Sequence, residues 1–119
     1  MNIKEIAKKA TSLGRIMSER PNKIDTETII EKYPNGITID DMELVDLAGE
    51  EVCVIGFKEE PESFAFCGMV LKNMCVEVID FINDNGKDTR VLQSEPIKVK
   101  LEKGKTRDGK REITKVTVL

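Results

Sequence analysis

The 119-residue sequence contains no histidine and no tryptophan, and only 4% of its residues are aromatic. Without histidine the chain cannot build the common zinc sites, a Ser-His-Asp or Cys-His nucleophilic arrangement, or a histidine general base. Carboxylates are plentiful, but no pattern places two of them in one apolar pocket. We therefore expect a protein that is not an enzyme.

Cysteine is scarce, and its number is odd. Cys53, Cys67 and Cys75 each stand in an apolar run, and their spacing fits neither a C-x-x-C redox pair nor a disulfide framework. We interpret them as reduced core residues, since a free cysteine behaves as a small hydrophobe. The sequence predicts no metal ion and no other cofactor.

Long hydrophobic runs are also missing. No window approaches the roughly 18 consecutive apolar residues of a membrane helix, and the chain opens on an amphipathic pattern without the apolar core of a signal peptide. With 39% hydrophobic and 34% charged residues, the composition is that of one globular domain. We expect a cytoplasmic protein.

Charge is distributed unevenly, although the net charge is only −3. Residues 1–25 hold six basic and three acidic side chains, and residues 26–97 hold five basic and sixteen acidic ones. Residues 98–119 then carry eight basic and three acidic side chains. A local basic surface can attract a polyanion even when the whole protein is acidic.

The first quarter of the chain reads as helical. Apolar residues recur at helical spacing between Ile3 and Leu13 and predict a first helix that ends at Gly14. Residues 15–23 resemble a polar connection, and residues 27–32 a short helical segment with its N-cap at Asp25-Thr26. We assign residues 1–25 to an N-terminal helical extension and residues 26–119 to the main domain.

Strand patterns dominate the main domain. Residues 37–47 alternate and then change phase, which predicts a long strand with a bulge or a strong coil, and two doubly apolar runs follow at 51–59 and 63–71. A helical stripe from Leu71 to Ile82, which includes Phe81, precedes two further strands at 96–104 and 111–119. The order β-β-β-α-β-β predicts an α+β, mainly β fold, an OB-like five-stranded barrel, with an open α+β sheet as the alternative.

The last two strands are joined by a segment that matches the start of a phosphate-binding motif. Gly104–Lys110 fits the first seven positions of G-x-x-x-x-G-K-[ST], but Arg111 replaces the required hydroxyl and a strand follows where a P-loop needs a helix. The segment is either a solvated hairpin whose lysines protect an edge strand, or a basic finger that contacts phosphates. The residues of that finger are Lys98, Lys100, Lys103, Lys105, Arg107, Lys110 and Arg111.

Single-strand binding also uses aromatic rings on which bases stack. Tyr33 and Phe57 each stand beside a lysine and a turn, so we expect these rings to be exposed. Phe64 and Phe66 share one strand face and are either a stacking platform or core, whereas Phe81 is predicted to be core.

The loops around the predicted binding face are acidic. Their side chains could pair with the basic hairpin, repel DNA or attract a protein. They are Asp46, Glu50 and Glu51 between the first two strands, and Glu59, Glu60 and Glu62 between the next two.

Three segments resemble a group of small bacteriophage and mobile-element proteins described as single-stranded DNA-binding: "YPNGITIDDMELV", "SFAFCGMVLKN" and "KVKLEKGKTRDGKREITKVTVL". The resemblance spans roughly residues 26 to 119. It implies an OB-like fold, binding without catalysis, a bacterial host cytoplasm and homo-oligomerisation. On these positions it assigns the oligonucleotide face to Phe57, Phe64, Phe66 and the basic hairpin.

Two functional hypotheses follow. The first is a non-catalytic protein that binds single-stranded DNA or RNA through backbone charge and limited base stacking. The second is a protein-interaction module, such as a phage-encoded inhibitor of a host defence protein, that acts through its acidic loops.

Overall fold

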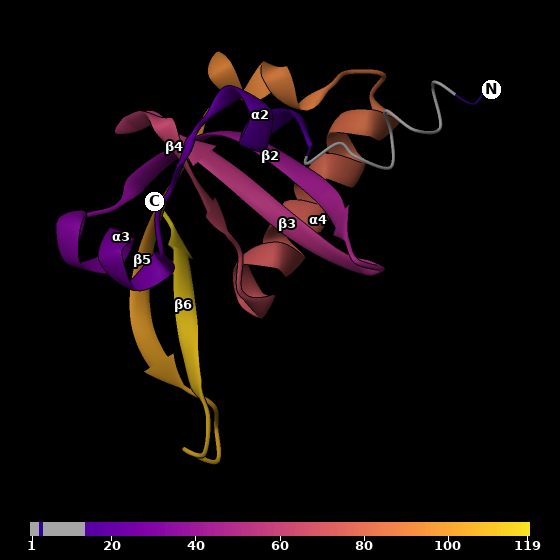
Figure 1. The fold of residues 1–119 in the computed structure, drawn as a ribbon. Coiled ribbons are helices and arrows are strands. Elements are labelled where there is room, and N and C mark those ends of the chain that lie inside the picture. The colour runs from indigo at the N-terminus through magenta and orange to yellow at the C-terminus, as the bar shows by residue number, and fades with distance from the viewer. Residues whose placement is uncertain (1–2, 4–13) are drawn as a thin grey trace.

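One six-stranded sheet organises the chain in the computed structural model, which describes residue 3 and residues 14–119. The sheet has the order β1-β4-β3-β2-β5-β6 and curls into a half-barrel (Figure 1). The strands are β1 (Asn22–Lys23), β2 (Ile37–Leu47), β3 (Glu50–Phe57), β4 (Glu60–Phe66), β5 (Ile97–Lys105) and β6 (Glu112–Val118).

The predicted α+β class and the predicted succession β-β-β-α-β-β are confirmed by β2 to β6. The strand number is six and not five, because β1 pairs in parallel with β4. Only two residues form β1, too few for an alternating pattern to be visible in the sequence. The helix predicted for residues 3–13 lies outside the described residues, apart from Ile3 itself.

Residues 15–23 do not form the polar connection that we expected. They contain the helix α2 (Arg15–Glu19) as well as β1. Ile16 is fully buried against the outer face of the sheet, and Arg15 donates two hydrogen bonds of 2.7 Å to the Asp41 carboxylate. The segment is mostly polar, yet Ile16 packs into the core and Arg15 binds Asp41. A hydropathy pattern reveals neither contact.

The phase change in β2 is a bulge, as predicted. The register against β3 shifts between Ile39 and Asp41. At the shift Asp41 is buried, and Arg20 donates a 2.9 Å hydrogen bond to Asp40 and three more to backbone carbonyls of β3 and β4. A Cβ on Gly56 would lie 2.4 Å from the Arg20 guanidinium carbon, so this glycine makes room for the side chain.

Three helical segments complete the fold: α3 (Thr26–Lys32), α4 (Met69–Asp84) and the 3₁₀ helix η1 (Thr89–Gln93). The helix α4 ends at Asn85 and Gly86, whose φ of 70° is the left-handed conformation predicted for its end. Among the described residues, no helix is both long and apolar enough to cross a membrane.

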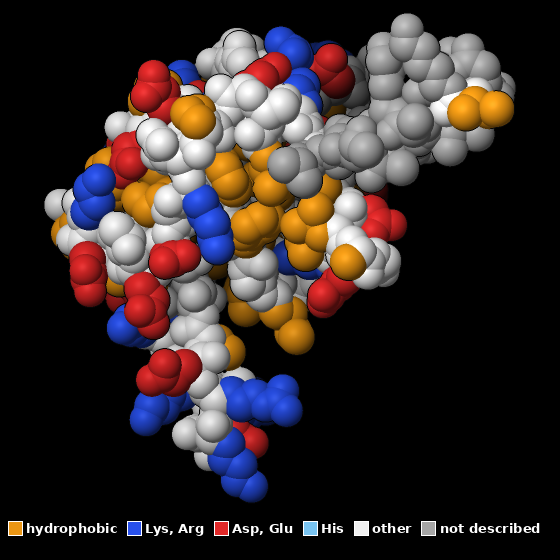
Figure 2. Space-filling view, viewed as in Figure 1, with side chains coloured by type: hydrophobic (Ala, Val, Ile, Leu, Met, Phe, Trp, Pro, Cys, Tyr) orange, Lys and Arg blue, Asp and Glu red, His pale blue; other side chains and the backbone are white. Residues whose placement is uncertain are grey.

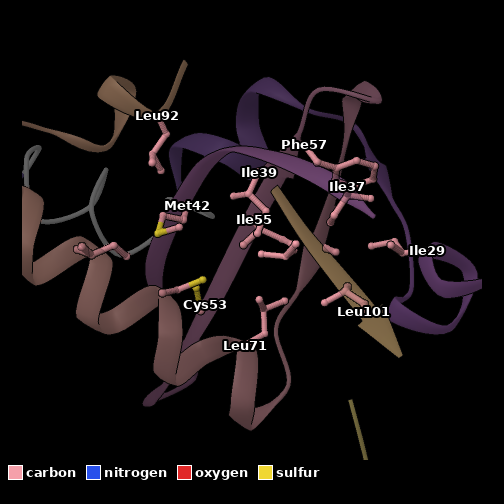
Figure 3. Close-up of a cluster of buried hydrophobic side chains, with 14 of the residues drawn as sticks. Ile29, Ile37, Ile39, Met42, Cys53, Ile55, Phe57, Leu71, Leu92 and Leu101 are labelled. Atoms are coloured by element: carbon pink, nitrogen blue, oxygen red, sulfur yellow. The ribbon is translucent and has the colours of Figure 1, made fainter. Parts of the chain in front are cut away.

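The main core lies between the concave face of the sheet and α4 (Figure 3). The helix contributes Leu71, Cys75, Ile79 and Ile82 to this core. Phe81, which we predicted to be core, is 70% exposed. It lies about 100° around the helix axis from Ile82 and so leaves the buried stripe.

A second, smaller cluster lies on the opposite, outer face of the sheet. Ile16 of α2 covers Val45, Val54 and Phe64 there. Both faces of β3 are thus buried, which explains why its sequence shows no alternation.

Candidate nucleic-acid interface

The hairpin of β5 and β6 projects from the body as an arm, which we define as residues 102–115 (Figure 1). Its antiparallel register runs from Val99 opposite Val118 to Lys105 opposite Glu112. Val99 and Leu101 are buried at its base, whereas the side chains beyond them are mostly exposed. The predicted hairpin is confirmed.

A compact turn closes the tip of the arm. Thr106 donates a side-chain hydrogen bond to Asp108, which also accepts one from the backbone N–H of Lys110. The bond from Thr106 is the main cause that lowers the pKa of Asp108. Gly109 has a φ of 69°, which favours glycine. Since β6 follows the turn, the G-x-x-x-x-G-K match has no helix N-terminus for a phosphate, and a P-loop is excluded here.

Lysine and arginine side chains cluster on the arm (Figure 2). Two of the predicted finger residues form ion pairs: Lys100 lies 3.6 Å from Glu102, and Lys103 lies 3.9 Å from Glu27 of α3. Within the described part of the chain the remaining five form none: Lys98, Lys105, Arg107, Lys110 and Arg111. Unpaired cations on an exposed element remain available to an anionic ligand.

A groove of about 490 Å³ separates the arm from the start of α4. Lys103 and Arg111 line its arm side, while Met69 and Val70 line the helix side with 77% and 40% of their surface exposed. Ile113 adds a further apolar side chain to the wall. The groove therefore combines cations with exposed apolar surface. We predicted Met69 and Val70 as the end of a strand at 63–71, which is wrong: β4 ends at Phe66 and these two residues open α4.

The structure contradicts the exposure expected for two aromatic rings. Phe57 is fully buried and packs edge-on against Tyr33 with 5.9 Å between ring centroids. Tyr33 donates a 2.7 Å hydrogen bond from its hydroxyl to Glu60, which raises the pKa of Tyr33 to about 12 and lowers that of Glu60. Phe57 belongs to the main core and is not placed to stack a base, whereas Tyr33 is half-buried beside it.

Phe64 and Phe66 lie together on the outer face of the sheet, with 5.8 Å between ring centroids. Phe64 is buried beneath α2, whereas Phe66 is half-buried and the Lys23 ammonium lies 5.3 Å from its ring. Phe66 precedes Gly68, a groove residue, by two positions. Phe66 itself does not line the groove and stays on the outer face of the sheet, where it packs against the second cluster.

Two of the acidic side chains near the turn between β3 and β4 accept hydrogen bonds from neighbouring residues outside the arm. Glu59 accepts hydrogen bonds from the backbone and the side chain of Thr38, and Glu60 accepts them from Tyr33, Lys32 and Ser63. They do not pair with the basic finger.

The three cysteines meet, although they are separated in the sequence. Their sulfur atoms all lie within 4.8 Å of one another. Hydrogen bonds from Cys67 and Cys75 lower the pKa of Cys53, and the bonds to Cys53 together with burial raise the pKa values of the other two thiols. All three are free, and Cys53 and Cys75 are buried as predicted. The spacing could not show the cluster, because the pairing of β3 with β4 creates it.

No protein-family model, curated protein or solved structure matches this chain. The assignment of a function therefore depends on the geometry of the arm and groove.

Proposed function

We propose that this chain binds single-stranded nucleic acid, without catalysis, along the arm and the adjoining groove. The observation that carries the proposal is the set of unpaired cations on the arm beside an exposed apolar wall. The phosphates would lie against Lys105, Arg107, Lys110 and Arg111, and bases would contact Met69, Val70 and Ile113 in the groove. Such a pairing of charge with apolar or aromatic surface is how sequence-independent single-strand binding works.

The strand arrangement supports this proposal. The neighbours β4-β3-β2-β5-β6 have the order of an OB-fold opened between its third and fifth strands, and we propose that the domain is an OB-like half-barrel. In that fold the hairpin joining the last two strands and the face of the second and third strands bind oligonucleotides. Here these elements are the arm and the β3–β4 face that carries Phe66.

Fluorescence anisotropy with a labelled oligothymidylate tests the proposal. Binding should be measurable at low salt and fall steeply as salt rises, because neutralised phosphates release counterions. Replacing Arg107→Gln and Lys110→Gln together, the arm variant, should weaken binding roughly tenfold and reduce the slope of log K against log salt by about 1.4, which is two contacts at single-strand values.

A matched control removes two positive charges elsewhere. Lys58→Gln and Lys87→Gln change exposed lysines outside the arm and groove by the same net charge. This control variant should keep most of the affinity. Absence of binding at low salt, or equal losses in both variants, would show that the arm is not a nucleic-acid interface.

A second candidate, protein binding, is favoured by the outer face of α4. Phe81 is 70% exposed there and is surrounded by the exposed carboxylates Glu77, Asp80 and Asp84. An aromatic ring inside an acidic rim suits a basic protein partner. In a pull-down from nuclease-treated bacterial lysate, a partner retained by the wild type and lost with Phe81→Ser would favour this function over the first.

A further inference from the structure

The cysteine cluster lies where three elements meet. Cys53 belongs to β3, Cys67 follows the end of β4, and Cys75 is in the second turn of α4. The backbone N–H of Cys67 donates a 2.9 Å hydrogen bond to the carbonyl of Cys53, so the two residues are fixed as cross-strand neighbours. Figure 3 shows Cys53 between the sheet and the helix.

The spacing of the sulfur atoms is close to that of a metal–thiolate site. A metal–sulfur distance of about 2.3 Å implies sulfur atoms about 3.8–4.0 Å apart in tetrahedral or trigonal geometry. The three sulfurs already lie within 4.8 Å of one another. Movements of roughly 1 Å or less would bring all three to bonding distance of one ion, which side-chain rotation can supply.

The surroundings can balance the charge of such a site. Three thiolates and one divalent ion have a net charge of −1, which is costly to bury unless it is compensated. Lys72 lies one helical turn before Cys75 and brings a positive charge to this end of α4, where its ammonium also lies 3.9 Å from the Glu51 carboxylate. Its ammonium is held by a 2.7 Å hydrogen bond to the carbonyl of Glu51. The helix α4 begins directly after Cys67 and Gly68 and adds the partial positive charge of its N-terminus.

Access is limited to one side. Cys53 and Cys75 have no exposed surface, whereas Cys67 is partly exposed. An ion could enter past Cys67, and solvent could supply one further ligand there. The chain offers no histidine, so the three thiols are the ligands that this cluster presents to an ion.

We infer that Cys53, Cys67 and Cys75 bind one thiophilic d¹⁰ ion, Zn(II) or Cu(I), through three thiolates. Three soft donors select this class of ion over hard cations. Cu(I) is satisfied by the three sulfurs, whereas Zn(II) takes a fourth ligand from solvent beside Cys67. Each thiol that ligates releases its proton, so binding is tighter at higher pH. The ion would join β3, β4 and α4 in the core, apart from the arm and independent of the proposed function.

Metal titration of the reduced full chain under anaerobic conditions tests this inference. Zn(II) is titrated against a chromophoric chelator, and Cu(I) in parallel against bicinchoninate; binding of one equivalent of one ion and none of the other identifies the ion. Co(II) serves as a spectroscopic probe. We expect one equivalent per chain, a sulfur-to-metal charge-transfer band with Co(II), and a higher melting temperature of the loaded protein.

Cys67→Ser removes one ligand at the partly exposed position and should weaken binding by more than about 100-fold, the upper range for loss of a mere outer-shell partner. Met74→Leu removes the thioether of the residue next to Cys75 in the sequence, which is not one of the proposed ligands, and should bind as the wild type does. Should Cys67→Ser fail to fold, alkylation of the wild type replaces it: a bound ion should slow the reaction of Cys67 with iodoacetamide. Weak binding without a charge-transfer band, equal affinity of Cys67→Ser, or unprotected thiols would show an ordinary cluster of reduced core thiols.

Discussion

Two regions of this chain carry an excess of basic side chains, and the protein uses them in opposite ways. Near the N-terminal end of the described chain, Arg15 and Arg20 are bound by aspartates of β2 and are 25% and 12% exposed. On the arm, Arg107 and Lys110 are exposed and have no ion-pair partner among the described residues.

The difference arises from the sheet beneath each region. Asp40 and Asp41 lie at the bulge in β2. Asp41 binds Arg15 and Asp40 binds Arg20, so β2 supplies a carboxylate to each arginine. The arm extends beyond the core, and its own carboxylates are few. Asp108 is already occupied within the turn. A basic bias in a sequence therefore indicates a ligand surface only where the fold does not supply the counter-charge.

The largest effect on stability should come from breaking the ion pair between Arg15 and Asp41. Asp41→Ala removes the acceptor of the two shortest of the four Arg15 side-chain hydrogen bonds and leaves the guanidinium, 25% exposed, without its main partner. We expect a loss of about 3 kcal/mol in the free energy of unfolding, the low end for a broken buried pair. Urea denaturation followed by circular dichroism measures it.

The charge-matched control for that experiment is Glu50→Ala at the exposed first position of β3, which should change stability by less than about 0.5 kcal/mol. Equal losses in the two variants would mean that the net charge, and not the Arg15–Asp41 pair, sets the effect.

Much of the fold could be predicted from the sequence, because its strands and its long helix carry strong periodic patterns. The phase change near Asp41 revealed the bulge, and the Asp108-Gly109 pair revealed the hairpin. Two elements could not be predicted, namely α2 and β1. Each is too short for periodicity, and both are held by long-range contacts such as Arg20 with Asp40.

Less of the candidate site could be predicted. Local composition located the arm, since charge runs are visible in a single sequence. The burial of Phe57 depends on how the strands pair, and the groove wall at Met69 depends on where α4 begins. Both are set by tertiary structure and not by local composition. The cysteine cluster is the extreme case, because only the pairing of β3 with β4 brings Cys67 beside Cys53.

A smaller loss of stability is expected at Tyr33, a ring that we predicted to contact bases and whose hydroxyl donates a hydrogen bond to Glu60. Tyr33→Phe removes the hydroxyl that donates to Glu60 and should cost about 1 kcal/mol at neutral pH, with affinity for oligothymidylate unchanged. A loss of affinity without a loss of stability would place Tyr33 in the interface.

The pH dependence of that difference follows from the two pKa shifts. The folded pKa of Tyr33, about 12, lies above its ordinary value of 10.0, so its stabilisation is present below pH 10 and is lost as pH rises to 12. The folded pKa of Glu60 lies below its ordinary 4.5, so its stabilisation is present above that value and is lost as pH falls through the lowered pKa. Wild-type and Tyr33→Phe unfolding curves should therefore converge at both extremes; a constant gap would contradict the hydrogen bond.

The smallest effect on stability is expected for substitutions on the arm. This result would distinguish the arm from the region of Arg15 and Arg20, where the cations are paired. The arm variant, Arg107→Gln with Lys110→Gln, removes no ion pair and no buried surface among the described residues. Its free energy of unfolding should match that of the Lys58→Gln/Lys87→Gln control within about 0.5 kcal/mol, while its affinity for oligothymidylate falls. Thermal denaturation of both variants at low and high salt measures this. A loss above about 1 kcal/mol in the arm variant alone would mean that these cations stabilise the fold as Arg15 and Arg20 do, and the contrast between the regions would fail.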